Sequence, residues 1–233
     1  SEQKSYILKK IKNNILKNSS KKIIFGEDYF YKKDKNRFVY EDKLNKINLP
    51  LPNLTGDFQI SNVATAIATA RTLNQFKISD FNIKNAITKI RSEGRLQNIT
   101  KGKLRQYVSK NNKIIIDGAH NTLAASVVQK YLKTLNSGRK IIMILGMMAN
   151  KEHREFIQIF KDRVHSIVVM DIPNQVNYIK KEKLLRIVQS CGIKSKTENS
   201  IKSALKNISK ENNDAIILFT GSLYFAGEVL NLN

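Results

Sequence analysis

An acidic residue and an imidazole stand close together near the middle of the chain, in the stretch Asp117-Gly118-Ala119-His120. The three isoleucines before Asp117 are typical of a short buried strand, and the residues after His120 are typical of the first turn of a helix. A carboxylate and an imidazole at such a strand end can orient a ligand, and the free helix N–H groups beside them attract anions. The structural alternative is an Asp-Gly turn next to a capping residue.

Two other segments place small or polar turn residues after a predicted strand. They are Gly146–Lys151 and Thr220–Ser222. Because the carboxyl ends of parallel strands meet at one edge of a sheet, we expect these two loops to converge with Asp117–His120 on one ligand. The chain contains no G-x-G-x-x-G, G-x-x-x-x-G-K-[ST] or G-x-S-x-G motif, which argues against a dinucleotide site, a P-loop of its own and a serine hydrolase.

The elements that must position these loops alternate between strand and helix, a pattern that predicts an α/β fold with a doubly wound, mostly parallel sheet. The predicted strands cover 106–109, 113–117, 140–145, 166–170, 192–197 and 215–219. The predicted helices cover 123–135, 152–160, 180–189, 201–208 and 222–230.

The residues before about Gly94 show a different sequence pattern. It predicts a helix over 1–20, strands at 22–25, 28–31 and 37–40, a loop over 41–55, and helices over 61–73 and 79–90. The change falls near Gly94, so we expect two domains, 1–94 and 95–233. Since the chain does not begin with Met, it can be a piece of a longer protein.

The composition of the 233 residues bounds the function. The net charge of +22 is spread as +7 over 1–50, +7 over 51–112 and +8 over 113–233. This even distribution indicates a lysine-rich composition of the whole chain and argues against a localised nucleic-acid-binding patch. We find no run of about 18 apolar residues and no signal peptide. The single cysteine, Cys191, suits a reducing cytoplasm, and the three histidines, His120, His153 and His165, lack metal-ligand spacing.

Five short motifs, taken together and in this order, resemble the folylpolyglutamate synthase/dihydrofolate synthase family of the Mur ligase superfamily. The motifs are the segment 51–62 (LPNLTGDFQISN), Gly94-Arg95-Leu96-Gln97, Asp117–Asn121 (DGAHN), 146–151 (GMMANK) and 220–230 (TGSLYFAGEVL). The family's P-loop has no counterpart here. The resemblance therefore implies a Mur-ligase-type, Rossmann-like C-terminal domain preceded by the α+β tail of an incomplete ATPase domain. Three positions depart from the family pattern: Phe58 replaces a His, Thr122 replaces a Pro, and Ser92-Glu93 replaces a Trp-Pro.

By the same resemblance, five residues would form the site. Asn62 would contact adenine, Arg95 the ATP phosphates and Asp117 the ribose hydroxyls, while His120 and Ser222 would meet the incoming glutamate. Each has a structural alternative: helix packing for Asn62, a hinge salt bridge for Arg95, and capping or an orienting hydrogen bond for the other three. Lys151 could bind a phosphate or glutamate, or simply be solvated.

The reaction implied is an ATP-dependent ligation of L-glutamate to dihydropteroate or a folyl-polyglutamate through an acyl phosphate. We expect ATP and Mg²⁺ as cofactors, with the Mg²⁺ ligands in the missing region, and a cytoplasmic monomer that closes about a hinge near Gly94. We expect no membrane or nucleic-acid partner, and no ligation by this chain alone. The alternatives are another Mur-type amide ligase with a different acceptor, or a non-catalytic, basic nucleic-acid-binding domain.

Overall fold

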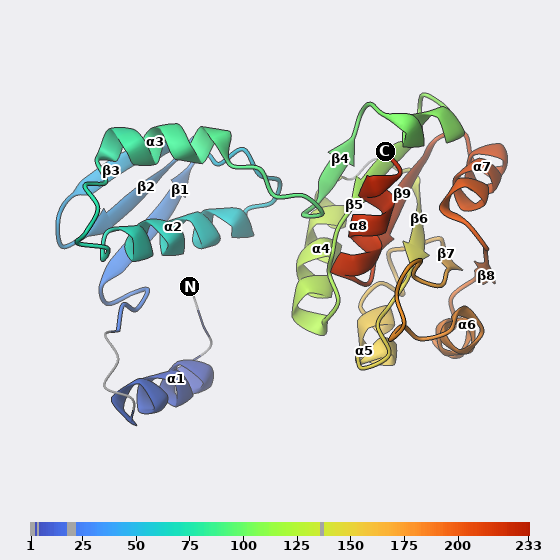
Figure 1. The fold of residues 1–233 in the computed structure, drawn as a ribbon, viewed down its shortest axis with the longest axis horizontal. Coiled ribbons are helices and arrows are strands. Elements are labelled where there is room, and N and C mark those ends of the chain that lie inside the picture. Colours follow the sequence, from blue (N-terminus) through green and yellow to red (C-terminus); the bar gives the residue numbers. More distant parts are fainter. Residues whose placement is uncertain (1–2, 4, 18–21, 136–137) are drawn as a thin grey trace. The chain divides into compact units, whose positions relative to one another are not determined.

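The computed structural model describes residues 3, 5–17, 22–135 and 138–233. The chain divides into two compact units, Ser1–Arg91 and Ser92–Asn233, which are described separately below and are drawn together in Figure 1.

The second unit is built on a six-stranded sheet in the order β4-β5-β9-β6-β7-β8. β4 pairs with β5 antiparallel, and every other neighbouring pair is parallel. The predicted doubly wound, mostly parallel sheet is therefore confirmed. The strands are β4 (Gln97–Ile99), β5 (Lys113–Ile116), β6 (Lys140–Leu145), β7 (Ser166–Val169), β8 (Ser195–Thr197) and β9 (Ala215–Thr220).

Helices cover both faces of this sheet because both faces are apolar. Side chains of α7 and α8 share a core cluster with Ile114, Ile217 and Phe219. The strand residues between them, such as Ile115 and Leu218, point to the opposite face of the sheet and are equally buried. We assign α4, α5 and α6 to that face. The helices are α4 (Thr122–Thr134), α5 (His153–Gln158), α6 (Lys181–Ser190), α7 (Ile201–Glu211) and α8 (Leu223–Asn231).

One predicted strand of this unit is wrong. Residues 106–109 form no strand, and a 3₁₀ helix, η1 (Lys103–Tyr107), runs into them. The guanidinium of Arg105 donates hydrogen bonds to the carbonyls of Asn112, Ser109 and Lys110 and so holds the chain in a turn. The antiparallel edge strand is β4 instead. It begins with the polar residues Gln97 and Asn98, which are typical of a loop in sequence, and it is a strand because it pairs with β5.

The first unit is a three-stranded antiparallel meander packed against two helices. Phe38, Tyr40, Ile47 and Leu49 of the sheet share a core with apolar side chains of the helices. Its elements are α1 (Ser5–Lys17), β1 (Tyr29–Asp34), β2 (Arg37–Asp42), β3 (Lys46–Pro50), α2 (Phe58–Ala70) and α3 (Asp80–Lys89). Ser79 caps α3, since its hydroxyl accepts from Asn82 N–H in a capping box.

Three predictions for this unit are corrected. The expected strand 22–25 is only an isolated bridge between Phe25 and Tyr29, because the Asp28 carboxylate binds the N–H of Ile24 and closes a turn. The expected loop 41–55 contains β3, in which buried and exposed residues alternate and Pro50 is tolerated at the sheet's edge. The helix expected over 61–73 is α2, which begins and ends three residues earlier. The ends of the helix predicted over 1–20, residues 1–2, 4 and 18–20, lie outside the described residues.

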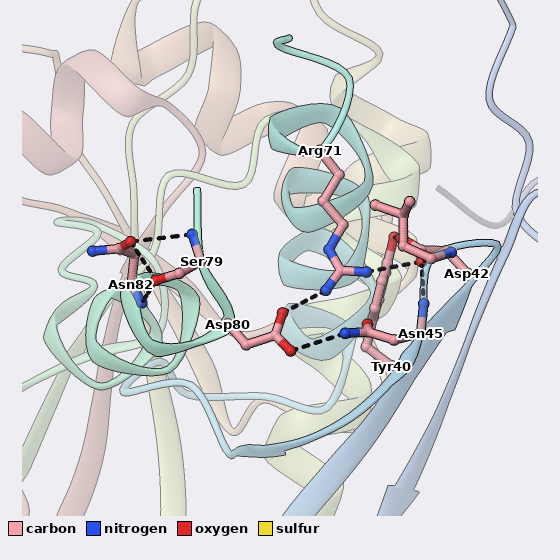
Figure 2. A network of polar contacts seen from close by, with 8 residues as sticks. Tyr40, Asp42, Asn45, Arg71, Ser79, Asp80 and Asn82 are labelled. Carbon is pink, nitrogen blue, oxygen red and sulfur yellow. Dashed lines mark hydrogen bonds and ion pairs between the residues drawn. The ribbon is translucent and has the colours of Figure 1, made fainter. Parts of the chain in front are cut away.

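A buried guanidinium ties the sheet of the first unit to its helices (Figure 2). Arg71, after α2, donates to Asp42 Oδ1 at 2.8 Å and to Asp80 Oδ1 at 2.6 Å. Its side chain is 8% exposed, against 11% for Asp42 and 39% for Asp80. The guanidinium also lies 5.5 Å from the centre of the Tyr40 ring, whose hydroxyl donates to Asp42. One side chain thus joins β2, α2 and α3.

This network sets the acid sensitivity of the first unit. Partial burial favours a protonated Asp42, but hydrogen bonds from Leu44 N–H, Arg71 and Tyr40 outweigh it and lower the pKa of Asp42. A carboxylate with a lowered folded-state pKa stabilises the fold fully above about pH 4, the pKa of an unfolded Asp. We therefore expect this contribution to disappear as the pH falls through the folded-state pKa.

Replacing Arg71 by Met should destabilise the first unit by about 2 kcal/mol, because Asp42 keeps its charge and loses its partner. The cost is smaller than for a fully buried pair, since water reaches Asp80. Urea unfolding of Arg71→Met at pH 7 and pH 3.5 should show a smaller pH effect than the parent chain. An unchanged pH effect would contradict the role given to the guanidinium.

Candidate functional site

Three of the loops that follow parallel strands converge as predicted on a pocket of about 550 Å³. His120 follows β5, Met148–Lys151 follow β6, and Ser222 follows β9. We call this the carboxyl-edge pocket. Its lining residues are His120, Met148, Ala149, Asn150, Lys151, Asn177, Ser222, Leu223 and Tyr224.

One lining residue, Asn177, was not anticipated from the sequence. It belongs to the loop between β7 and α6, and its carbonyl accepts a hydrogen bond of 2.8 Å from Ala149 N–H. A bridge between Met148 and Tyr178 joins the same two loops. Since β7 is also a parallel strand, the rule used for the other loops extends to this one, although the loop carries no recognisable motif.

The pocket exists because the backbone approaches itself closely at Gly221. Its φ is +110°, a region that disfavours residues with a Cβ. A Cβ placed there would lie 2.5 Å from the carbonyl oxygen of Gly146. Only glycine therefore allows the β9 loop to lie against the β6 loop.

The imidazole of His120 is held in one tautomer by its own loop. Nδ1 lies 3.0 Å from the carbonyl oxygen of Gly118, and a carbonyl can only accept, so Nδ1 carries the proton. In the neutral ring Nε2 then keeps its lone pair and can accept a proton or a hydrogen bond. The helix after it is capped by Asn121, whose side chain accepts from Ala124 N–H.

Ser222 and Lys151 supply the other polar groups of the pocket. Ser222 is buried and caps α8, its Oγ accepting from Tyr224 N–H at 3.1 Å. The hydroxyl proton remains available for a ligand. Lys151 is half-buried, and none of the ion pairs found among the described residues includes it. The pocket thus offers an imidazole, a hydroxyl and an uncompensated ammonium.

Asp117 does not line the pocket. It is 5% exposed, and each carboxylate oxygen accepts a backbone N–H at 2.8 Å, Oδ2 from Leu96 and Oδ1 from Ala119. Burial raises the pKa of Asp117 above its ordinary value, although these hydrogen bonds and the charges of Arg95 and His120 oppose the rise. In this position the carboxylate holds two loops together.

Arg95 lies on one of those loops, next to Asp117. Gly118 N–H donates to the Gly94 carbonyl at 2.8 Å, and Leu96 is held at a φ of +47°. Among the described residues the guanidinium makes one long hydrogen bond, 3.5 Å to the Gly94 carbonyl. A half-buried guanidinium with so little to bind is free to take an anion such as a phosphate.

The structure therefore groups the predicted site residues into two sets within the second unit: His120 with Ser222, and Arg95 with Asp117. Asn62 belongs to the first unit, on α2. It is exposed there, and its amide donates to the side-chain oxygen of Gln59 at 3.1 Å.

Removing the Asp117 carboxylate should release the loop that carries Arg95. In Asp117→Ala the N–H groups of Leu96 and Ala119 lose their acceptors, so we expect a loss of about 2 kcal/mol. Hydrogen exchange of the Leu96 amide should accelerate more than exchange across β6. If the Leu96 amide stays equally protected, Asp117 does not hold this loop.

The described residues contain no group of three or more His, Cys, Asp or Glu side chains that could hold a metal ion. Among the same residues, no helix combines the length and apolarity needed to cross a membrane.

Residues 100–232 match the family model described as the C-terminal domain of dihydrofolate synthetase. A folylpolyglutamate synthase of Lacticaseibacillus casei is 27% identical over 197 residues, which are 83% of this chain and 42% of that protein. A dihydrofolate synthase/folylpolyglutamate synthase of Buchnera aphidicola subsp. Acyrthosiphon pisum is 27% identical over 207 residues, 88% of this chain and 46% of that protein. The chain spans about half the length of the curated relatives it matches.

Solved structures share the fold at lower identity. Escherichia coli FolC in complex with ADP superposes with a TM-score of 0.77 at 21% identity, over 95% of this chain and 50% of that one. Mycobacterium tuberculosis folylpolyglutamate synthase, solved with ADP and AMPPCP, gives 0.78 at 16% identity, over 99% and 53%.

Proposed function

Because the chain belongs to the family of dihydrofolate synthetase C-terminal domains, we propose that it supplies the C-terminal part of an ATP-dependent ligase. The reaction would join L-glutamate to dihydropteroate or to a folyl-polyglutamate. The observation that carries this proposal is the carboxyl-edge pocket, where His120, Lys151 and Ser222 come together from three loops.

The pocket suits the amino acid that is added. The ammonium of Lys151 and the hydroxyl of Ser222 can bind the carboxylates of glutamate. In its neutral form His120 presents the lone pair of Nε2, which can accept a proton from the glutamate ammonium and so expose the amine that attacks. We assign His120 and Ser222 the catalytic roles on this basis.

Nucleotide would bind along the neighbouring loop. Arg95 offers a guanidinium to the phosphates of ATP, and the exposed amide of Asn62 is assigned to adenine. Asp117 is assigned to the ribose hydroxyls, although its two backbone hydrogen bonds show that it also positions the Arg95 loop. ATP would supply the acyl phosphate that glutamate attacks, and this step depends on positioning and charge stabilisation.

The remaining parts of the enzyme are expected outside this chain. The 1–91 unit would be the tail of an ATPase domain whose P-loop and Mg²⁺ ligands lie elsewhere, with closure about a hinge near Gly94. We propose a monomer that works in the cytoplasm, where Cys191 stays reduced, without membrane or nucleic-acid partners. This chain alone should not ligate glutamate.

A second ligase activity is favoured by one further relative. A UDP-N-acetylmuramoyl-L-alanyl-D-glutamate–2,6-diaminopimelate ligase of Buchnera aphidicola subsp. Baizongia pistaciae is 26% identical over 187 residues, 34% of that protein. The competing proposal is therefore a Mur-type amide ligase with a different acceptor. Both proposals use the same pocket and differ in what is ligated.

The decisive experiment joins this chain to the P-loop half of the Lacticaseibacillus casei relative and measures ATP-dependent incorporation of the labelled amino acid, glutamate or diaminopimelate. Dihydropteroate and tetrahydrofolate are offered as acceptors, with a muramyl peptide precursor and diaminopimelate as the alternative pair. We expect glutamate transfer to a folate acceptor, abolished by His120→Ala. Transfer only to the muramyl acceptor, or activity of the 233-residue chain by itself, would refute the respective part of the proposal.

A further inference from the structure

A second pocket lies at the opposite edge of the six-stranded sheet, where strands β6, β7 and β8 begin. Its volume is about 470 Å³. We call it the amino-edge pocket, and none of its residues lines the carboxyl-edge pocket. Its lining residues are Lys140, His165, Ser166, Ile167, Lys194, Ser195, Lys196, Glu211 and Asn212.

The strand register brings these residues together. Ser166 pairs with Ile142, two residues into β6 from Lys140, and Ser195 pairs with Ile167. The carbonyl of Lys194 accepts from Ile167 N–H at 2.9 Å. Because three adjacent parallel strands begin at the same edge of the sheet, residues near their starts surround a common space. Lys140 and Lys196 lie in strands, and Lys194 immediately precedes β8.

Positive charge is in excess in this pocket. Lys196 is paired with Glu211 at 2.6 Å. Lys140 and Lys194 occur in none of the ion pairs or side-chain hydrogen bonds found among the described residues. Their two ammonium groups leave a surplus of two positive charges, which a doubly charged anion would neutralise.

One serine hydroxyl completes the lining. Ser166, at the start of β7, lies on the same face of the sheet as Lys140 and Lys196, because it pairs with Ile142 and is followed two residues later by the partner of Lys196. Ser195 pairs with Ile167, so its side chain belongs to the opposite face, where its Oγ is buried, and the hydroxyl takes no part in the pocket.

We propose that the amino-edge pocket binds the phosphate group of a small phosphate monoester. Such a group carries close to two negative charges at neutral pH and three acceptor oxygens. The charge matches Lys140 and Lys194, and one of the oxygens matches the hydroxyl of Ser166. The volume exceeds that of a single phosphate and leaves space for the organic part of the ligand.

The test is a titration of the isotope-labelled 233-residue chain with inorganic phosphate and with glycerol 2-phosphate, at constant ionic strength set with chloride. We expect saturable amide shifts at Ser166, Ser195 and Lys196, with the monoester binding at least as tightly as phosphate. Shifts that grow without saturation across many lysines, or that centre on His120 and Lys151, would overturn the proposal.

Two sets of variants distinguish anion binding in the amino-edge pocket from attraction by the net charge of the chain. Lys140→Gln/Lys194→Gln should weaken binding about tenfold or more, and Ser166→Ala should weaken it less, with the thermal midpoint of each variant unchanged. The matched control, Lys133→Gln/Lys183→Gln, removes the same charge from exposed positions on α4 and α6. An equal loss in the control would show that net charge, and not this pocket, binds the anion.

Discussion

Replacing Gly221 by Ala should destabilise the second unit by about 3 kcal/mol and lower its melting temperature by roughly 10 °C. The new Cβ would lie 2.5 Å from the Gly146 carbonyl oxygen and 2.8 Å from Leu145 Cδ1, on a residue with a φ of +110°. The nearest obstacle is a backbone carbonyl oxygen, so a rotamer change cannot relieve it. The β9 loop must move, and the pocket that contains Ser222 changes shape with it.

The matched control for this prediction is Gly227→Ala. Gly227 lies inside α8, and a Cβ there meets nothing within 4 Å. The same substitution should therefore stabilise the unit by about 0.5–1 kcal/mol through helix propensity. Differential scanning calorimetry of the two variants would measure both effects, and similar melting temperatures would contradict the role given to Gly221.

Arg95→Ala should lower the rate of glutamate ligation about a hundredfold in the joined enzyme described above, because the phosphates would lose a charged, bidentate partner. Arg95→Lys should recover only part of the rate, since an ammonium lacks the planar fork of a guanidinium. Among the described residues the guanidinium makes one hydrogen bond, of 3.5 Å, so neither change should lower the melting temperature by more than a degree or two.

Steady-state kinetics with ATP as the varied substrate would test this expectation, with Arg186→Ala as the control. Arg186 is exposed on α6, away from the pocket. A loss of rate accompanied by an equal loss of stability would point to a structural role for Arg95. A full rate in Arg95→Ala would remove this residue from the site.

Hydrophobic pattern alone predicts most of the second unit. Runs such as Ile114–Ile116 and Ile141–Leu145 are apolar on both faces, and only a sheet covered by helices on both sides buries them. The position of Ser222 also follows from the sequence, because a serine after a Thr-Gly turn caps the next helix. These features are local, so they can be read residue by residue.

The features that the sequence hides depend on distant partners. β4 is a strand only because Gln97–Ile99 lie beside β5, and Asn177 reaches the pocket only through the contact between the β6 and β7 loops. Likewise, the sequence does not reveal that the Asp117 carboxylate accepts hydrogen bonds from the N–H groups of Leu96 and Ala119. The bond from Leu96 depends on how a distant loop folds back beside β5, which local sequence patterns do not specify.

The strand order has a consequence for how the protein is made. β9 lies between β5 and β6 in the sheet, but it follows them in the chain by about seventy to a hundred residues. Until the ribosome has released Ala215–Thr220, the nascent chain holds two apolar strands with open edges facing each other. The sheet can therefore close only after β9 has been synthesised, and chaperones that shield unpaired strands would have their largest effect on yield in the interval before that.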